Sequence, residues 1–499
     1  MKKALFLTAV LAGLLTSGSY SQIMEQQSIE SAEVNDTCRI IDEYLTQLSI
    51  DKGFSGGLLI IKGGTRIFNK GYGWANKDKK IPFTPLTLAS MGSITKAFTA
   101  AAILKLSEQG KLCVNDPLSK FFPDIPDEKA DITIHQLLTH SSGFHEFLKG
   151  DGGDFEKIET AEYLKRAFRE PLAFRPGEKA VYTNVGMSVL GIIIEKVSGT
   201  DYETFLQKNL LEPAGIYNMG YHVADSEDDI IAHGYQNGND WGTISGRIAS
   251  VGDQPYWNLK ANGGLHASLD DMYLWVRAVN NNAVLSDSSV GKMFTAHIVE
   301  EGYGGQSFFG YGCNITKSRR GTKMIDNGGS NGIFFARLVR LPEEGVVFYI
   351  VTNESTMNAN MVLPNITQLY FNGRIGQDAT VLKPEFKTRQ AARIYNILEE
   401  TKSTGLSDEL EKQRITVDDD MVLLEVGRRF IEEKKTDQAL SLYKFYTHRF
   451  PEIIVAWNDM GDVYQMTGNK EEAIRCYNQA LKLNPGNQRA IENLKKLNE

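Results

Sequence analysis

The 499-residue sequence predicts an α+β fold followed by a separate, all-helical C-terminal region. Strand-like segments stand near residue 60 and again between residues 308 and 352. The chain between them, from about Leu88 to Val290, has the pattern of helices and long loops. Strands at both ends with helices inserted between them indicate one antiparallel sheet, flanked by helices, beside an inserted helical subdomain. A repeat with a period of 34 residues marks the C-terminal region.

The first 21 residues are expected to be a signal peptide. Lys2 and Lys3 precede an apolar segment from Ala4 to Leu15, and small residues follow it. The apolar segment is shorter than the roughly 20 residues of a membrane span, and no later segment reaches that length. We therefore expect an exported protein, periplasmic or secreted, that does not span the membrane. An N-terminal anchor helix is the alternative.

One domain is expected over residues 36–373. Its elements are predicted in this order: a helix over 36–49, two strands around a turn at Gly63-Gly64, the helical segment, four strands within 308–352, and a helix near 357–371. Hydrophobic residues make up 42% of the chain, which is enough for a large core. The net charge of −8 and the lack of a long basic run argue against a nucleic-acid partner.

Residues 374–415 are polar and are expected to form a linker, with one helical pattern near 389–398. The region 416–499 then repeats itself at the period of the tetratricopeptide repeat. The matching pairs are Gly427 and Gly461, Ala439 and Ala473, Tyr443 and Tyr477, and Pro451 and Pro485. This region predicts a binding site for a protein partner. The alternative is that its helices only cap or rigidify the first domain.

Ser93 and Lys96 have the setting of a catalytic pair. Serine is a weak nucleophile until a neighbouring base takes its proton, and residues three apart share one face of a helix. Ser93 heads a long apolar helix predicted over 94–108, and the N-terminus of a helix favours negative charge. Other Ser-x-x-Lys pairs lack this setting and are attributed to chance: Ser49/Lys52, Ser289/Lys292 and Ser441/Lys444.

Five short motifs of the sequence occur together in one known superfamily: GSITK (92–96), TIHQLLTHSSG (133–143), FRPGE (174–178), YTN (182–184) and NGGL (262–265). On these motifs the segment from about Gly53 to Asn353 resembles the serine β-lactamase and penicillin-binding-protein superfamily. It is most similar to the branch of class C β-lactamases and D-alanyl-D-alanine carboxypeptidases. The Ser-Asp-Asn motif of the class A branch is absent.

The resemblance implies roles for four residues. Ser93 matches the acylated nucleophile, and Lys96 matches the residue that shares or accepts its proton. Tyr182 matches a second general acid and base, and Asn184 matches the amide that orients the lysine and the substrate carbonyl. A phenolate near an ammonium would be stabilised by it, so Tyr182 and Lys96 are expected to tune each other.

The third motif of the superfamily, Lys-Thr-Gly or His-x-Gly, departs from its pattern here. The best match is Asp326-Asn327-Gly328, which is expected to bind substrate. A shift of the alignment by one residue would put Asn327, in place of Asp326, at the position of the motif's lysine or histidine. An aspartate there would repel the carboxylate of a penicillin or of a D-alanine end. The N–H of Gly329 is expected to form an oxyanion hole with the N–H of Ser93.

The leading hypothesis is a serine hydrolase that acts by acyl transfer on a lactam, a D-amino-acid peptide of the cell wall, or an ester. The altered third motif favours a less anionic substrate. The alternative is a non-catalytic sensor or scaffold for cell-wall fragments that binds a protein through residues 416–499. We expect no metal or other cofactor, because three histidines lack ligand spacing and four isolated cysteines form no CxxC motif: His135, His140, His266, Cys38, Cys113, Cys313 and Cys476. The pairing of these cysteines stays open.

Overall fold

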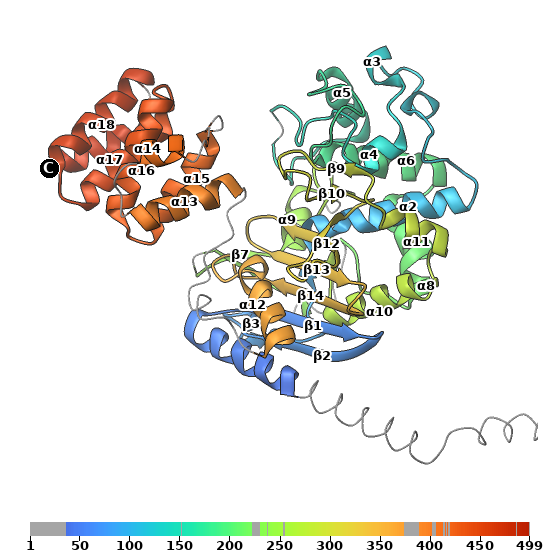
Figure 1. Ribbon diagram of the computed structural model, residues 1–499. Coiled ribbons are helices and arrows are strands. Elements are labelled where there is room, and N and C mark those ends of the chain that lie inside the picture. Colours follow the sequence, from blue (N-terminus) through green and yellow to red (C-terminus); the bar gives the residue numbers. More distant parts are fainter. Residues whose placement is uncertain are drawn as a thin grey trace, which may run out of the picture. The chain divides into compact units, whose positions relative to one another are not determined.

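A computed structural model describes residues 36–498, except 151, 222–229, 237, 253–254, 374–388, 402–405, 413–414, 416, 418–419 and 486. The chain divides into two compact units between Leu382 and Lys383 (Figure 1). The predicted signal peptide, residues 1–21, lies outside the described residues. Within the described ranges, the helices are too short or too polar to cross a membrane.

Unit 1 is built on one antiparallel sheet of eight strands in the order β2-β1-β14-β13-β12-β11-β10-β9. The strands are β1 Gly56–Lys62, β2 Thr65–Tyr72, β9 Ile298–Val299, β10 Phe308–Phe309, β11 Asn314–Lys317, β12 Lys323–Ser330, β13 Phe335–Leu341 and β14 Val346–Thr352. Strand β1 pairs with β14, so the first and last strands of the unit lie side by side. The predicted antiparallel sheet is therefore confirmed, with the helical segment inserted between β2 and β9.

Each face of the sheet packs against its own core, because side chains alternate along a strand. On one face, Phe348 and Ile350 of β14 pack against α12 Ala359–Asn372 and the helix over 36–52. On the other face, Tyr349 and Val351 of the same strand join the large core of the helical subdomain. Figure 1 shows α12 and the first helix on one side of the sheet and the subdomain beyond it.

The helical subdomain is centred on α2 Thr95–Glu108, which follows a short 3-10 helix, η1 Gly92–Ile94. The other helices of the subdomain are α3 Asp127–Ala130, α4 Ile134–Leu138, α5 Thr160–Arg169, α6 Asn184–Ser198, α7 Tyr202–Leu206, α8 Glu212–Ala214, α9 Ile244–Val251, α10 Leu269–Asn280 and α11 Asp287–Met293. Unit 1 also contains a short 3-10 segment, η2 Leu118–Lys120, and a π segment, η3 Gln207–Leu211. Three two-stranded pairs complete it: β3 Trp74–Asn76 with β4 Ile81–Pro82, β5 Ala89–Ser90 with β8 His266–Ala267, and β6 Gly234–Gln236 with β7 Asn239–Gly242. A helix that is apolar on most sides belongs inside a core, and eleven of the fourteen residues of α2 are buried.

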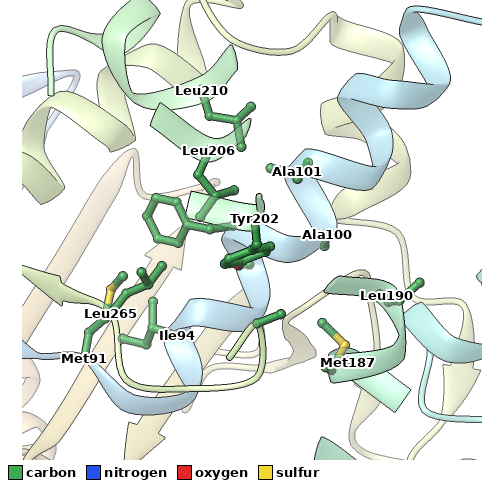
Figure 2. Packing of buried hydrophobic residues seen from close by; sticks show 14 of the residues in the cluster. Met91, Ile94, Ala100, Ala101, Met187, Leu190, Tyr202, Leu206, Leu210 and Leu265 are labelled. Carbon is green, nitrogen blue, oxygen red and sulfur yellow. The ribbon is translucent and has the colours of Figure 1, made fainter. Parts of the chain in front are cut away.

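Figure 2 shows how this core closes around the start of α2. Side chains from several elements meet there: Met91, Ile94, Ala100, Ala101, Met187, Leu190, Tyr202, Leu206, Leu210 and Leu265. In the first turn of α2, the ring of Phe98 stacks on Trp275 of α10 with centroids 4.3 Å apart. The first turn of α2 is thus held by packing on several sides.

Unit 2 is all-helical, with α13 Arg389–Thr401, α14 Leu406–Lys412, α15 Asp420–Glu432, α16 Thr436–Arg449, α17 Ile454–Met466, α18 Lys470–Leu483 and α19 Gln488–Asn498. The repeat has a packing reason. A Cβ added to Gly427 would lie 2.5 Å from the ring of Tyr443, and one added to Gly461 would lie 2.7 Å from the ring of Tyr477. Each glycine therefore lets a buried tyrosine of the next helix approach the backbone.

Two parts of the predicted linker are helical, because Arg389–Thr401 forms α13 and Leu406–Lys412 forms α14. Side chains of both helices lie in one apolar core with α15 and α16: Ala391, Ile394, Tyr395, Leu398, Leu406 and Leu410. The spacing of Ala391, Ile394, Tyr395 and Leu398 is that of one helix face. The sequence showed this pattern, but its polar surroundings concealed that the helix is part of the folded unit.

We expect Phe98→Ala to lower the free energy of unfolding by about 3–5 kcal/mol, because a fully buried ring leaves a cavity. Phe147→Ala is the matched control, since that ring is 53% exposed, and its effect should stay within about 0.5 kcal/mol. Urea unfolding of both variants measures the difference. Equal losses would contradict the central place of α2 in the core.

Candidate active site

Ser93 lies in η1, at the start of α2, where the backbone makes a tight bend. Gly92 has a φ of +51°, a value that glycine adopts without strain. The segment is fixed on both sides of this bend, since the N–H of Met91 donates to the carbonyl of Leu265 at 2.9 Å and the N–H of Ile94 donates to that of Met91 at 3.2 Å. Ser93 itself is partly exposed, so a substrate can reach its hydroxyl.

Lys96 is buried one turn further along, and its ammonium has two hydrogen-bond acceptors. Its Nζ donates to Ser93 Oγ at 3.0 Å and to the carbonyl oxygen of Asn262 at 2.5 Å. Burial lowers the pKa of Lys96 to about 7, against the opposing effect of the carboxylates of Glu146 and Asp154. A neutral amine at physiological pH can accept the proton of Ser93.

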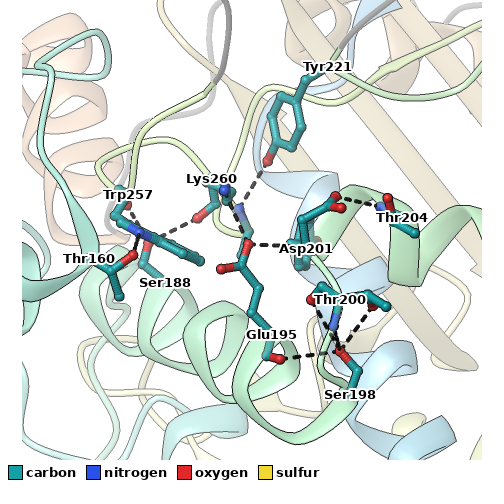
Figure 3. Close-up of polar contacts among 12 residues, drawn as sticks. Thr160, Ser188, Glu195, Ser198, Thr200, Asp201, Thr204, Tyr221, Trp257 and Lys260 are labelled. Atoms are coloured by element: carbon teal, nitrogen blue, oxygen red, sulfur yellow. Dashed lines mark hydrogen bonds and ion pairs between the residues drawn. The ribbon is translucent and has the colours of Figure 1, made fainter.

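The carbonyl of Asn262 is aimed at Lys96 by a loop whose backbone groups are bound from several elements. The Nδ2 of Asn262 donates to Ser188 Oγ and to the carbonyl of Asn258, both at 2.9 Å. Ser188 Oγ also contacts the carbonyls of Trp257 and Lys260 at 2.7 and 3.1 Å (Figure 3). The resemblance had marked this loop as a motif without a role, because a backbone acceptor leaves no signature in side-chain chemistry.

Tyr221 fixes the same loop at its centre. Its hydroxyl, drawn in Figure 3, accepts the N–H of Ala261 at 3.0 Å. It also donates to the carbonyl of Gly263 at 2.7 Å. From α2, Thr99 Oγ1 donates to the carbonyl of Ala261 at 2.6 Å. The residues on both sides of Asn262 are therefore held, and its carbonyl has little freedom to turn away from Lys96.

Tyr182 completes the group at Ser93. Lys96 Nζ lies 4.7 Å from the centre of its ring, and its hydroxyl also interacts with Ser93. Burial raises the pKa of Tyr182 well above its ordinary value. The structure thus brings together Ser93, Lys96 and Tyr182, three residues that the sequence analysis assigned to one site.

Asn184 follows Tyr182 by two residues, and the role that the resemblance implies for it stays a prediction. It begins α6, which Thr183 caps through a hydrogen bond of its Oγ1 with the N–H of Gly186. The Oδ1 of Asn184 is buried and has no hydrogen-bond partner within the described part of the chain. Lys96 Nζ instead donates to the carbonyl oxygen of Asn262.

Strand β12 turns Asp326 and Asn327 toward opposite faces of the sheet. Asp326 faces α12, where Arg337 of β13 binds its carboxylate through two hydrogen bonds, one of them 3.0 Å from Nε to Oδ1. Asn327 is buried on the opposite face, and its Nδ2 donates to the carbonyl of Gly312 at 2.6 Å. The prediction that Asp326 repels a substrate carboxylate is therefore wrong, because its charge is paired with Arg337 and turned away from Ser93. Asn327 is the motif residue on the catalytic face.

The backbone N–H that lies beside Ser93 is one residue away from the one predicted for an oxyanion hole. The N–H of Asn331 donates to the carbonyl of Phe334 at 3.3 Å, and bonded pairs alternate along an antiparallel ladder. Gly329, which faces Ala336, then falls in a bonded pair with β13, whereas Ser330 falls in a non-bonded pair and directs its N–H away from β13. A Cβ added to Gly92 would lie 2.5 Å from the nitrogen of Ser330, so this N–H stands next to that of Ser93.

Gly328 and Gly329 have different surroundings. A Cβ added to Gly329 would lie 2.0 Å from the carbonyl oxygen of Met91 and 2.9 Å from the nitrogen of Ser93. A Cβ added to Gly328 would meet only the side chain of Arg337, at 3.5 Å. Gly329 therefore lets β12 touch the backbone around Ser93, and Gly328, expected to bind substrate, faces the side of Arg337.

Comparison with known proteins decides the family. Residues 41–369, more than half of the chain, match the family described as Beta-lactamase. The chain belongs to the β-lactamase family. This is a family of serine β-lactamase-like enzymes and includes penicillin-binding-protein homologues, so the resemblance seen in the motifs is confirmed. Residues 454–487 match the tetratricopeptide repeat, which suggests protein binding by unit 2.

Two curated β-lactamase-family relatives are similar over part of their length. PbpX of Bacillus subtilis (strain 168), which carries a penicillin-binding-protein name, is 32% identical over 54% of this chain and 65% of its own. Protein flp of Staphylococcus aureus (strain N315) is 29% identical over 49% of each chain. The chain thus spans less than two thirds of either relative.

Solved structures show the same fold. An octameric penicillin-binding protein homologue from Pyrococcus abyssi has a TM-score of 0.54 at 30% identity, over 63% of this chain and 73% of its own. A penicillin binding protein from Bacillus halodurans has a TM-score of 0.52 at 25% identity, over 62% and 94%. Both likenesses confirm the α+β fold of unit 1.

We expect Gly329→Ala to destabilise the protein by about 1–3 kcal/mol, because the added methyl group would collide with backbone that has no room to move. Gly328→Ala, the neighbouring control, adds the same atom at ordinary contact distance and should stay within about 0.5 kcal/mol of the wild type. Thermal unfolding of the two variants distinguishes them. A Gly328→Ala variant as unstable as Gly329→Ala would contradict the assignment of faces along β12.

Proposed function

We propose that the chain is a serine hydrolase that works through an acyl-enzyme on Ser93. The observation that carries the proposal is the 3.0 Å contact between Ser93 Oγ and a buried lysine whose pKa is near 7. Such a lysine is a base of the right strength at neutral pH, because the best general base titrates near the working pH. Membership of the β-lactamase family supports the proposal.

Acylation follows from the geometry in two proton transfers. Ser93 Oγ attacks the carbonyl carbon of the substrate as its proton passes to neutral Lys96, and the carbonyl oxygen becomes an oxyanion that the N–H groups of Ser93 and Ser330 can stabilise. The bond to the leaving group then breaks, and the leaving nitrogen or oxygen takes a proton through Tyr182 and Lys96. Water attacks the resulting ester of Ser93 and releases an acid and the free hydroxyl.

The substrate class follows from what β12 presents beside Ser93. The motif residue on that face is the amide of Asn327, whose Nδ2 already binds the carbonyl of Gly312. A neutral amide gives a substrate carboxylate less stabilisation than a cation would. We therefore propose a lactam, peptide or ester substrate, cell-wall peptides included, whose end near β12 is uncharged.

Location and partner are part of the same proposal. The basic and apolar pattern of residues 1–21 supports export to the periplasm or out of the cell. The tetratricopeptide match supports a protein partner for unit 2. A substrate derived from the cell wall would be accessible in that compartment.

A covalent adduct on Ser93 is the direct test. We expect the wild type to gain the mass of the acyl group with an activated neutral ester and, more slowly, with a fluorescent penicillin, whereas Ser93→Ala should gain none. Intact-protein mass spectrometry measures both. A folded wild type that forms no adduct with either acyl donor would favour the alternative, a non-catalytic sensor that binds cell-wall fragments.

The acylation rate should rise with pH and level off above a midpoint near 7, where Lys96 loses its proton. Below the midpoint the rate should fall roughly tenfold per pH unit, because only the neutral amine accepts the proton of Ser93. Stopped-flow measurement of adduct formation between pH 5 and 9 checks this. A rate that does not change across that range would show that Lys96 is not the base.

A further inference from the structure

His140 makes three contacts with the segment that carries Tyr182. Its carbonyl accepts the N–H of Val181 at 3.0 Å, and its Nδ1 accepts the N–H of Thr183 at 3.1 Å. Its ring lies on the ring of Tyr182, with centroids 4.9 Å apart and planes inclined by 31°. One residue therefore holds the peptide on each side of Tyr182 and the aromatic side chain between them.

We infer that His140 is a positioning residue that holds the Tyr182 hydroxyl at Ser93 for acyl transfer. The inference rests on the proposed function and adds a role that the motifs did not assign, since His140 was considered above only as a metal ligand and excluded. Its physical basis is that a hydroxyl displaced by about 1 Å can lose on the order of a hundredfold in rate.

An unusual backbone conformation allows the contacts. His140 has a φ of +55°, in the left-handed region that costs a non-glycine residue about 1–2 kcal/mol. In this conformation its carbonyl and its side chain both reach the 181–183 segment. Strain of this kind persists where the surroundings hold it and is frequent at functional sites.

The imidazole is also held from its other side. The ring of Phe309 in β10 lies 4.7 Å from it, centroid to centroid, so the imidazole packs against both Phe309 and Tyr182. Burial and the nearby charge of Lys96 lower the pKa of His140 to about 3. The imidazole is therefore neutral at any working pH, and the hydrogen bond from the N–H of Thr183 identifies Nδ1 as its unprotonated nitrogen.

Two substitutions separate positioning from simple packing. His140→Gly accepts the positive φ and removes the ring and the side-chain acceptor, whereas His140→Asn tolerates that φ and offers an amide oxygen near the place of Nδ1. The saturating acylation rate and the KM are measured with the activated neutral ester, together with the melting temperature of each variant.

We expect His140→Gly to stay folded and to lose about a hundredfold in the saturating rate, with a KM within about threefold of the wild type. His140→Asn should recover at least about tenfold of that loss, because it restores the acceptor. A folded His140→Gly that acylates within about threefold of the wild-type rate would overturn the inference, and so would a His140→Asn no faster than His140→Gly. A wild type that is not acylated overturns the proposed function itself, a result distinct from a normal wild type with unaffected variants.

Discussion

The site depends on one buried interaction, the hydrogen bond from Lys96 Nζ to the carbonyl of Asn262. An ammonium inside a core is costly unless its protons are bound, and the same burial makes the amine a base near neutral pH. The carbonyl binds one proton of the ammonium without adding a negative charge. A carboxylate in its place would raise the pKa of Lys96 again. The loop around Asn262 is accordingly fixed by Ser188, Tyr221 and Thr99, side chains that take no part in the chemistry.

A second constraint is the close approach of backbone segments around Ser93, and glycine makes it feasible at three points. A Cβ added to Gly92 would lie 2.5 Å from the nitrogen of Ser330, and one added to Gly329 would lie 2.0 Å from the carbonyl oxygen of Met91. A Cβ added to Gly312 would lie 2.5 Å from the carbonyl oxygen of Lys96. The sheet and the start of α2 therefore touch through main chain. This contact places the N–H groups of Ser93 and Ser330 side by side, and Gly312 also accepts the hydrogen bond of Asn327.

Side-chain chemistry could be predicted from the sequence, and main-chain geometry could not. Apolar patterns predicted the strands and α2, and motifs predicted that Ser93, Lys96 and Tyr182 meet. Both kinds of signal depend on residue type. The carbonyl of Asn262 and the N–H of Ser330 belong to groups that every residue carries. The direction of Asp326 depended on the phase of one strand, where a shift of one residue exchanges the faces.

The two basic groups beside Tyr182 are arranged so that only one of them titrates in the working range. Lys96 takes up a proton near pH 7 and His140 only near pH 3, because burial disfavours the charged imidazole and the charge of Lys96 opposes a second charge beside it. As the pH falls, the base is therefore lost while Nδ1 of His140 still accepts the N–H of Thr183. Loss of activity in mild acid would thus come from the protonation of Lys96 and leave the placement of Tyr182 intact.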